Sequence, residues 1–545
     1  MNNFYKDNEA LKKQLQHPLM ERIAEMCEKG YTNEEGSEYA PKDYNDLQDS
    51  YDKTLEILGE ISAEVIAANA ARVDLEGPHC ADGRVTYASG TQQNHETLIE
   101  AGLYGMTMPR RYGGLNFPTT LFVMASEIVA RADAGFCHIW SLQSCADTIN
   151  EFAEEELKEE FLPLIAEGAT CSMDLTEPDS GSDLQSATLR ATWNEELGEW
   201  RLNGVKRFIT NGDADVKLIL ARSEEGTTDG RGLSYFVYNK KWGGITVRRI
   251  EHKMGIKGSP TCELVFKDAP AKLIGRRRMG LIKYVMALMN SARLGIGAQS
   301  VGISEAAYRE AKRYAAERKQ FGQTIDNFAA VQEMLQSMKA RLDASRALLY
   351  ETSRNVDMYK LMQTKAQLTN EEKAEMKQYQ QDADMLTPLL KLTSSEYCNR
   401  NTYDAVQVYG GSGYMRDFTV ERLYRDARVT SIYEGTSQLQ VVAAIRYVTN
   451  GALLNKIEKY LEQLPASEQK SRLTVMTEQF ASACTMAAEQ GAAFTDRHAR
   501  RLVEMGAGIV MGALLLLDKA DEQSANLYIR MAQAENAAAI TFMTA

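Results

Sequence analysis

The residue with the clearest potential for chemistry is Glu434, in the segment SIYEGTSQ. Gly435 follows it and has no Cβ, so a ligand could approach the backbone beside the carboxylate. Thr436 or Ser437 could cap a helix that continues with QLQVVAAIRYV, and Ser437 with Gln440 has the spacing of a capping box. The helix dipole would stabilise the ionised carboxylate, so a base at this position needs apolar surroundings from bound substrate. The same pattern also fits an acid that only favours the helix start.

Cysteine and histidine spacing indicates no metal site. The eight cysteines form no CxxC pair, and the six histidines show no HExxH spacing, so we interpret the cysteines as reduced thiols, most of them in the core. The adjacent His79 and Cys80 lie in EGPHCADG, which we predict to be a loop without enough neighbouring ligands. GIGAQSVG and GAGIVMG lack the spacing of a dinucleotide fingerprint, and we interpret them as sites of close helix packing. Redox chemistry would therefore require an organic cofactor.

The elements that would position these residues change type along the chain. Residues 1–168 have apolar residues at three- and four-residue steps, which predicts an N-terminal helical domain. Residues 169–280 contain short β-rich runs, which predict a middle β-barrel-like domain with a hairpin turn at the Asn-Gly pair of EWRLNGVKRFI. Long helical segments predict a C-terminal four-helix bundle in residues 281–450 and a helical extension in residues 451–545. The expected fold class is α+β, mainly α.

Length and charge exclude several classes of protein. A chain of 545 residues is too long for one hydrophobic core. Its 75 acidic and 62 basic residues give a net charge of −13, which disfavours a nucleic-acid scaffold. The segment MNNFYKDNEALKKQLQH lacks the apolar core of a signal peptide, so we expect a cytoplasmic protein. The longest apolar run, from Ile509 to Leu517, is far shorter than the ~20 residues that span a bilayer, so we expect no membrane span.

Four ordered groups of motifs carry a resemblance to a known family. They are TEPDSGSD, KRFITNG, ERKQFG, and the pair VQVYGGSGY and SIYEGTSQ. Each is weak alone, but together they resemble the acyl-CoA dehydrogenase family, with further matches in RRYGG and HKMGIKGSPTCEL. The family has an N-terminal helical domain, a β domain and a four-helix bundle, the order predicted above from periodicity. Longer members add a C-terminal helical domain, which residues 451–545 resemble.

The resemblance implies a reaction. Glu434 matches the base that removes the α-proton of an acyl-CoA thioester, while its backbone N–H and a ribityl hydroxyl of FAD polarise the thioester carbonyl. Flavin N5 takes the β-hydride, the product is a trans-2-enoyl-CoA, and electrons pass to electron-transferring flavoprotein. Some branches carry the base on the first bundle helix before an arginine, but Ala292 stands there in this chain, which leaves Glu434.

The resemblance also implies the binding residues. Phe208, which stands where relatives often have Trp, matches a position beside the flavin ring, with an ordinary core aromatic as the alternative. Arg293 matches a position that contacts substrate or shapes its pocket, with a buried ion pair as the alternative. The implied FAD ligands in the same subunit are Met173, Leu175, Thr176, Ser182, Phe208, Thr210, Thr436 and Gln438, and the implied substrate ligands are Ser182, Arg293, Tyr433 and Gly435.

A second set of implied FAD ligands reaches the cofactor of a neighbouring subunit. A cation such as Arg318 suits a pyrophosphate, and a shared cofactor implies a homodimer or homotetramer. In FAAVQ, Ala329 stands where many relatives carry Gln, which puts that contact in doubt. The set comprises Arg318, Gln320, Phe321, Gln407, Gly410 and Gly411.

Other functions remain open at this stage. An acyl-CoA oxidase and a flavin monooxygenase share the fold; Glu434 argues against the monooxygenase, and the sequence does not separate oxidase from dehydrogenase. A nucleic-acid-binding relative would need a basic C-terminal domain, but residues 451–545 contain 9 basic and 11 acidic residues. Those residues could pack on the bundle or bind a partner. Acyl chain length and branching are also open, with a weak preference for a linear short or medium chain, as is the role of the charged stretch at residues 357–383.

Overall fold

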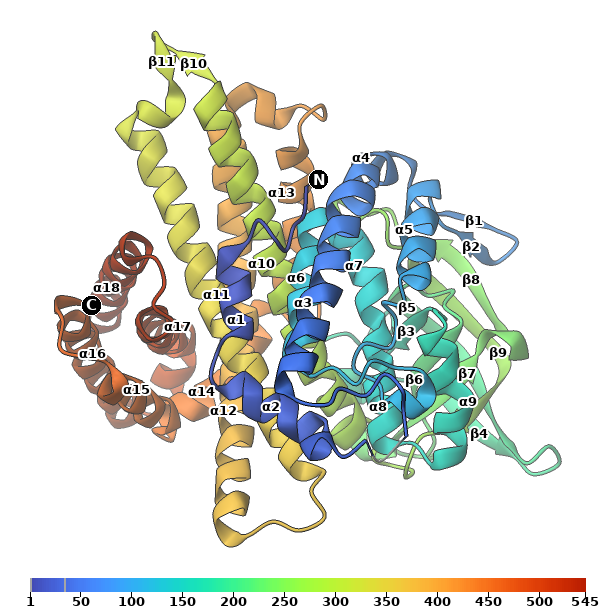
Figure 1. Cartoon of the computed structure of the whole chain (residues 1–545). Coiled ribbons are helices and arrows are strands. Elements are labelled where there is room, and N and C mark those ends of the chain that lie inside the picture. Colours follow the sequence, from blue (N-terminus) through green and yellow to red (C-terminus); the bar gives the residue numbers. More distant parts are fainter. Residues whose placement is uncertain (1, 34–35) are drawn as a thin grey trace. The chain divides into compact units, whose positions relative to one another are not determined.

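The computed structural model describes residues 2–33 and 36–545 and divides into two compact units, Met1–Gly295 and Ile296–Ala545 (Figure 1). Along the chain, helices are followed by strands and then by helices again, which confirms the α+β, mainly α, fold class. The boundary between the units falls inside one long helix, α10 (Met286–Glu317). Each unit is described in turn.

The first unit begins with helices that pack around α6. This segment, TTLFVMASEIVARA, is apolar around most of its circumference, as expected of a helix surrounded by protein, and most of its residues are buried. The amphipathic α3 buries only one face, with Tyr51 and Leu55 on it. The helices are α1 (Glu9–Leu15), α2 (Leu19–Cys27), α3 (Tyr44–Ile61), α4 (Ala67–Glu76), α5 (Ser89–Glu100), α6 (Thr119–Ala132), α7 (Ala134–Trp140), α8 (Cys145–Phe152) and α9 (Glu155–Ala166).

The segment around His79 and Cys80 is not the predicted loop. These residues lie on β1 (His79–Ala81), which pairs with β2 (Arg84–Thr86) in a short antiparallel hairpin. Asp82 and Gly83 both have positive φ angles, the requirement of a tight two-residue hairpin turn, which an Asp-Gly pair favours. The eight cysteines are all free thiols, five of them buried.

A seven-stranded sheet forms the β part of the first unit. Its order is β3-β6-β4-β5-β9-β7, with β8 beside β9. Because β7 also pairs with β6, the pairings return to β6 as in a barrel, although β4 meets β6 only at Arg190 and Arg222. The strands are β3 (Cys171–Asp174), β4 (Arg190–Asn194), β5 (Glu199–Thr210), β6 (Val216–Arg222), β7 (Leu233–Asn239), β8 (Ile245–Ile250) and β9 (Thr261–Leu273).

The predicted hairpin turn at Asn203-Gly204 is wrong. Both residues lie within the continuous strand β5, where the pairing with β9 shifts register between Leu202 and Gly204. Asn203 Oδ1 accepts a hydrogen bond from Asp268 N at 2.8 Å, so the Asn-Gly pair forms a β-bulge. The actual hairpin joins β4 to β5 through a turn at Gly198, which has φ +64°.

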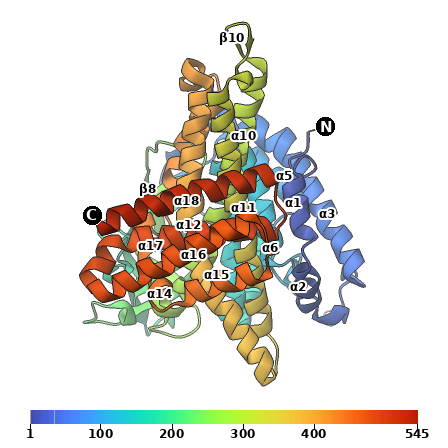
Figure 2. The ribbon, with the colours of Figure 1, turned by 90° about the vertical axis from the view of Figure 1, so that its left-hand side faces the viewer.

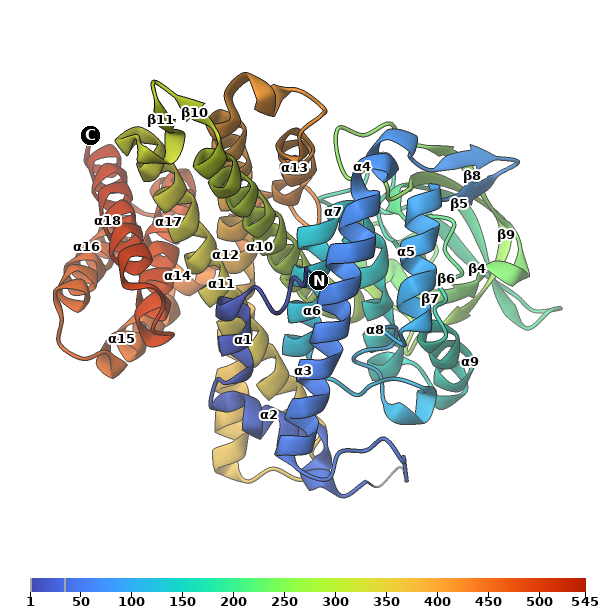
Figure 3. The same ribbon diagram turned by 45° about the horizontal axis from the view of Figure 1, so that its top comes forward.

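Two apolar cores lie on opposite faces of the sheet strands. One contains Phe161 and Ile165 of α9 with Leu218 of β6 and Tyr235 of β7, so α8 and α9 cover that face, as Figure 3 shows. The other lies on the opposite face of the strands and includes Trp200. The strands that lead into the candidate site are therefore held from both sides.

The second unit is built on long helices. Gly297 of α10 confirms the close-packing interpretation at one position of GIGAQSVG, because a Cβ there would lie 2.8 Å from a methyl carbon of Leu390 in α12, whereas a Cβ on Gly295 would meet nothing within 4 Å. The charged stretch 357–383 forms the end of α11 and the start of α12, which Thr369 and Glu372 begin with a capping box. The elements are α10, β10 (Lys319–Gln320), β11 (Gln323–Thr324), α11 (Ala329–Gln363), α12 (Asn370–Tyr409), α13 (Thr419–Ala427) and α14 (Ser437–Thr449).

The C-terminal extension packs on the bundle, which answers one question left open by the sequence. Ser524 Oγ donates to Asp343 at 2.7 Å, and Lys456 Nζ donates to Asp382 at 2.8 Å. Figure 2 shows the extension helices side by side. They are α15 (Ala452–Gln463), α16 (Glu468–Gln490), α17 (Ala492–Leu517) and α18 (Glu522–Thr544). Within residues 2–33 and 36–545, no helix combines the length and apolarity needed to cross a bilayer.

Candidate functional site

One group of predicted site residues lies on β3 and the loop after it, in the first unit. Met173 lies on β3, and Leu175 and Thr176 follow it directly. The carbonyl of Thr176 accepts from Arg207 N at 2.9 Å, and the carbonyl of Leu175 accepts from Lys206 Nζ at 2.8 Å. These bonds bring the predicted residues 173–176 beside the end of β5 that carries Phe208 and Thr210.

Glu177 holds the rest of this loop, a role that sequence reasoning missed. Its carboxylate accepts from Thr188 N at 2.7 Å, Leu189 N at 2.9 Å and Lys206 Nζ at 2.8 Å. Burial raises the pKa of Glu177, but the charge of Lys206 and these donors outweigh burial, so the pKa lies below its ordinary value. Ser182 is exposed on the loop that Glu177 anchors.

Phe208 is not an ordinary core aromatic. Its side chain is 51% exposed, its φ is +60°, and it lies where the pairing of β5 with β9 shifts between Lys206 and Ile209. A bulky residue at positive φ is uncommon and marks a constrained backbone. The Arg207 guanidinium lies 4.6 Å from the ring centroid. The bulge therefore presents an aromatic ring to the surface beside Thr210.

His138 of α7 contacts Thr210 and was missed as an individual residue. Its Nε2 lies 3.5 Å from Thr210 Oγ1. Burial, helped by the charge of Lys253, lowers the pKa of His138 to about 3, so the imidazole is neutral near pH 7.

Arg293 is the remaining predicted residue of the first unit. It lies on α10, is buried, and donates from Nη1 to Asn290 Oδ1 at 3.2 Å. This is a bond to a neutral amide one helical turn away.

A second group of predicted site residues lies on a turn in the second unit that contains Glu434. Both Glu434 and Gly435 have left-handed backbones, with φ +51° and +88°. The Gly435 carbonyl accepts from Lys391 Nζ at 2.6 Å and from Gln440 Nε2 at 2.9 Å. The hydroxyl of Tyr433 donates to the side-chain oxygen of Gln299 on α10. The turn is thus anchored to its surroundings on both sides of Glu434.

Helix α14 begins directly after this turn. Thr436 is its N-cap, since its side chain accepts from Leu439 N at 3.4 Å, and Gln438 is exposed in the first helical turn. The predicted capping box of Ser437 with Gln440 does not form, because the Gln440 side chain bonds the Gly435 carbonyl instead. Glu434 does lie just before the helix N-terminus, as predicted.

The predicted residues of the neighbouring-subunit group lie together at one end of the bundle. Arg318 and Gln320 are exposed beside Phe321, which is 94% exposed at the tip of the β10–β11 hairpin (Figure 1). Near the foot of this hairpin, Tyr314 of α10 stacks on Tyr409 of α12 with ring centroids 4.0 Å apart. This stack brings Gln407, Gly410 and Gly411 close to the hairpin. A Cβ on either glycine would meet nothing within 4 Å, so the backbone there is open to a ligand.

The structure does not bring this group to Glu434. The turn of Glu434 meets α10 at Gln299 and α12 at Lys391, whereas the tyrosine stack lies much further along both helices. At 1.5 Å per residue the separation along each helix is about 22–27 Å. One chain therefore carries two separate groups of predicted cofactor residues in its second unit.

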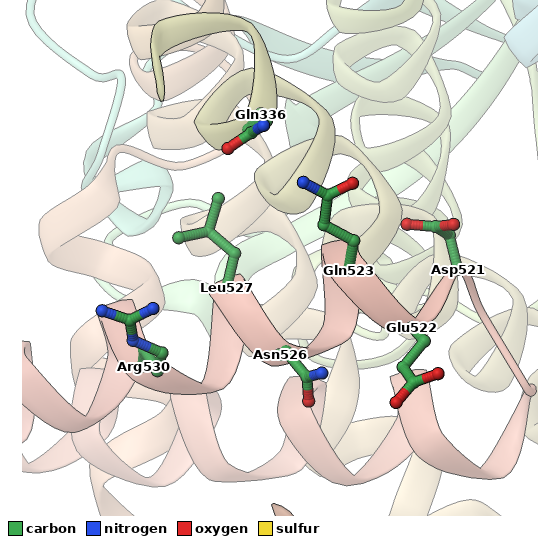
Figure 4. Close-up of a pocket in the computed structure, with 7 residues that line it drawn as sticks. All are labelled: Gln336, Asp521, Glu522, Gln523, Asn526, Leu527 and Arg530. Carbon is green, nitrogen blue, oxygen red and sulfur yellow. The ribbon is translucent and has the colours of Figure 1, made fainter. Parts of the chain in front are cut away.

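One pocket lies away from the predicted site residues. Figure 4 shows a pocket of about 530 Å³ between α11 and α18, lined by mostly polar residues that include Gln336, Asn526 and Arg530, and no predicted residue lines it. In the part of the chain that the structure describes, no group of three or more His, Cys, Asp or Glu residues could hold a metal ion.

Comparison with protein families gives four matches that together span most of the chain. The descriptions are acyl-CoA dehydrogenase N-terminal domain (residues 56–169), middle domain (172–269) and C-terminal domain (282–447), and acyl-CoA dehydrogenase C terminal (449–545). The last match covers the extension.

Individual proteins agree with these matches. An acyl-CoA dehydrogenase of Bacillus subtilis is 37% identical over 64% of this chain and 88% of its own length. The structure of butyryl-CoA dehydrogenase from Megasphaera elsdenii has a TM-score of 0.63 and 30% identity, covering 74% of this chain and 98% of that one. The structure of an acyl-CoA dehydrogenase from Bacillus anthracis, complexed with FAD, has a TM-score of 0.75 and 25% identity, covering 92% and 88%.

Proposed function

Because the chain belongs to the acyl-CoA dehydrogenase family and is an oxidoreductase, we propose that it binds FAD and dehydrogenates an acyl-CoA thioester to a trans-2-enoyl-CoA. The observation that carries this proposal is the turn of Glu434, a carboxylate on a left-handed backbone whose next carbonyl is bonded by the buried Lys391 and Gln440. Such anchoring suits a base that must meet a weakly acidic C–H in a fixed geometry.

The residues present fit FAD. A half-exposed aromatic ring at Phe208 suits the flat flavin, and the hydroxyls of Thr176, Ser182 and Thr210 suit its polar groups. Met173 and Leu175 would complete this surface beside β5, and Thr436 and Gln438 would contribute from the start of α14. When bound, FAD supplies the acceptor for the hydride that leaves the β-carbon.

Glu434 takes the α-proton in this proposal. The carboxylate gains the proton as the C–H bond breaks, while the backbone N–H of Glu434 donates to the thioester oxygen, where negative charge develops. Gly435 has no side chain to obstruct the thioester, and Ser182, Arg293 and Tyr433 would contact the rest of the substrate. The neutral His138 lies beside the Thr210 hydroxyl and would add no charge beside the cofactor.

The presence of two groups of predicted cofactor residues in the second unit supports a cofactor shared between subunits. Arg318, Gln320 and Phe321, with Gln407, Gly410 and Gly411, lie at the end of the bundle that carries the tyrosine stack, about 22–27 Å along the helices from the turn of Glu434. One FAD beside Glu434 is not expected to use both groups, so this set would hold the cofactor of a second copy. The assembly would then be a homodimer or homotetramer. Gel filtration with light scattering would test this, and a monomer that retains FAD would contradict it.

Several finer points stay proposals. Electrons would pass to electron-transferring flavoprotein, the acyl chain would be linear and short or medium, and the protein would be cytoplasmic. The division of the chain into four domains, with boundaries after residues 168, 280 and 450, also stays a proposal.

The test of the function is an anaerobic titration of the FAD-bound protein with saturated acyl-CoAs of increasing chain length. We expect the oxidised flavin band to bleach, most completely with one range of chain lengths. Admission of O₂ then separates the two chemistries, since slow reoxidation indicates a dehydrogenase and rapid reoxidation with H₂O₂ formation an oxidase. A flavin spectrum that no acyl-CoA bleaches would contradict the proposal.

A further inference from the structure

Lys391 is a fully buried lysine that lies against the turn of Glu434. It sits on α12 with 0% of the residue exposed, and its Nζ donates to the Gly435 carbonyl at 2.6 Å. A lysine is almost never fully buried without partners, because desolvation of its ammonium group is costly. A hydrogen bond from a charged donor is also roughly twice as strong as a neutral one. The burial of Lys391 therefore points to a specific task at this carbonyl.

The backbone of the turn explains why a strong donor is needed. Glu434 has a side chain and still adopts a left-handed conformation, which costs about 1–2 kcal/mol for an ordinary residue. Such conformations persist only where surrounding contacts enforce them. The Gly435 carbonyl receives two donors, Lys391 Nζ and Gln440 Nε2, and Gln440 also lies 3.4 Å from the Glu434 carbonyl. The two shorter bonds fix the peptide plane between Gly435 and Thr436, and the longer contact reaches the plane between Glu434 and Gly435.

Helix α12 holds the other end of the turn as well. Glu396, five residues after Lys391, accepts from Ser437 Oγ at 2.6 Å. The same Glu396 oxygen lies 3.5 Å from Nη2 of Arg500, in helix α17 of the C-terminal extension. Lys391 and Glu396, both on α12, thus bond the Gly435 carbonyl and the Ser437 hydroxyl, one and three residues after Glu434.

We propose that Lys391 is a positioning residue for the base: it holds the Gly435 carbonyl and thereby the direction of the Glu434 carboxylate, while Glu396 secures the start of α14. This inference rests on the proposed role of Glu434. It assigns Lys391 no contact with substrate and no proton transfer.

The test compares Lys391→Met, which keeps a similar shape and removes the donor, with Lys391→Gln, whose amide N–H can still donate. We expect Lys391→Met to lower kcat about 10- to 100-fold, as misplacement of a catalytic group by about 1 Å does, with KM changed less than about threefold. Lys391→Gln should recover part of that loss. Lys365→Met, at a half-exposed lysine near the end of α11, is the matched control and should leave both constants unchanged.

A readout independent of catalysis accompanies the kinetics. Hydrogen exchange followed by mass spectrometry should show faster exchange in the peptide that covers residues 430–440 of Lys391→Met, and little change elsewhere. If none of the acyl-CoAs bleaches the flavin of the wild-type protein, the proposed function is refuted. The exchange result would still decide whether Lys391 holds the turn.

Three outcomes would overturn the inference. One is a Lys391→Met protein with wild-type kcat, and another is unchanged exchange in residues 430–440. The third is an equal loss in Lys391→Met and Lys391→Gln, accompanied by loss of bound FAD, which would indicate a merely structural lysine. If Lys391→Met fails to fold, Gln440→Leu removes the second donor to the same carbonyl, and an unaltered kcat in that variant would refute the inference.

Discussion

The buried pair of Lys206 and Glu177 gives a prediction whose magnitude follows from its burial. The two side chains are 0% and 4% exposed, and their charged atoms lie 2.8 Å apart. Lys206→Met leaves the Glu177 carboxylate buried without its cation, and breaking a buried pair in this way costs about 3–5 kcal/mol. Because Thr188 and Leu189 still donate to Glu177, we expect a loss near the lower end, about 3 kcal/mol, in the free energy of unfolding of the first unit.

The assay can isolate the first unit. All four tryptophans of the chain, at positions 140, 193, 200 and 242, belong to that unit, so urea unfolding followed by tryptophan fluorescence reports on it selectively. Lys158→Met is the control, because Lys158 lies 3.8 Å from the half-exposed Glu155. A pair of this kind contributes about 0–1 kcal/mol.

A double variant separates charge from hydrogen bonding. Lys206→Met with Glu177→Leu removes both charges, so part of the lost stability should return. In the double variant the N–H groups of Thr188 and Leu189 also lose their acceptor, so retention of FAD on gel filtration should be poor. A Lys206→Met loss below about 1 kcal/mol, or full recovery of FAD retention in the double variant, would refute this reasoning.

Two further predictions concern the second unit. The charges of Arg346 and Arg309 outweigh the burial of Glu305 and lower its pKa to about 2. This depressed pKa contributes about 3 kcal/mol to the free energy of unfolding. The contribution is complete above pH 4.5 and is lost as the pH falls towards 2. Far-UV circular dichroism of thermal unfolding across this range should show that loss, and Glu305→Gln should remove this part of the pH dependence; an unchanged slope would contradict the assignment. Gly297→Val places methyl groups against Leu390, where even a Cβ would lie at 2.8 Å. It should destabilise the unit by about 1–3 kcal/mol in the same measurement. Gly295→Ala is the control and should leave the stability unchanged, because a Cβ there would meet nothing within 4 Å.

The elements were predictable because their patterns are local. Strands β6 to β9 and helices α10 to α12 lie where the change from two-residue to three- and four-residue periodicity placed them. The Asn203-Gly204 error shows the limit of local signals. An Asn-Gly pair favours a turn in isolation, but β9 pairs along β5 on both sides of it, and a bulge keeps that longer pairing intact.

The site was only partly predictable for a related reason. The position of Glu434 before α14 follows from Gly435 and Thr436, which are its sequence neighbours. Lys391 is 43 positions away and lies in an otherwise regular helix, so no local pattern marks it as the donor to the turn. The same holds for Glu177, whose partners lie up to 29 positions away. Residues that support a site through long-range hydrogen bonds leave no motif.

The central claim is that Glu434 removes the α-proton, and its most direct test is anaerobic mixing of the FAD-bound Glu434→Gln variant with the best acyl-CoA in D₂O. Glu522→Gln, which alters an acid in the first turn of α18, is the control for a carboxylate that only favours a helix start. We predict that Glu434→Gln retains FAD and acyl-CoA but neither bleaches the flavin nor incorporates deuterium at the α-carbon, while wild type and the control do both. Bleaching and α-exchange at the wild-type rate in Glu434→Gln would contradict the account.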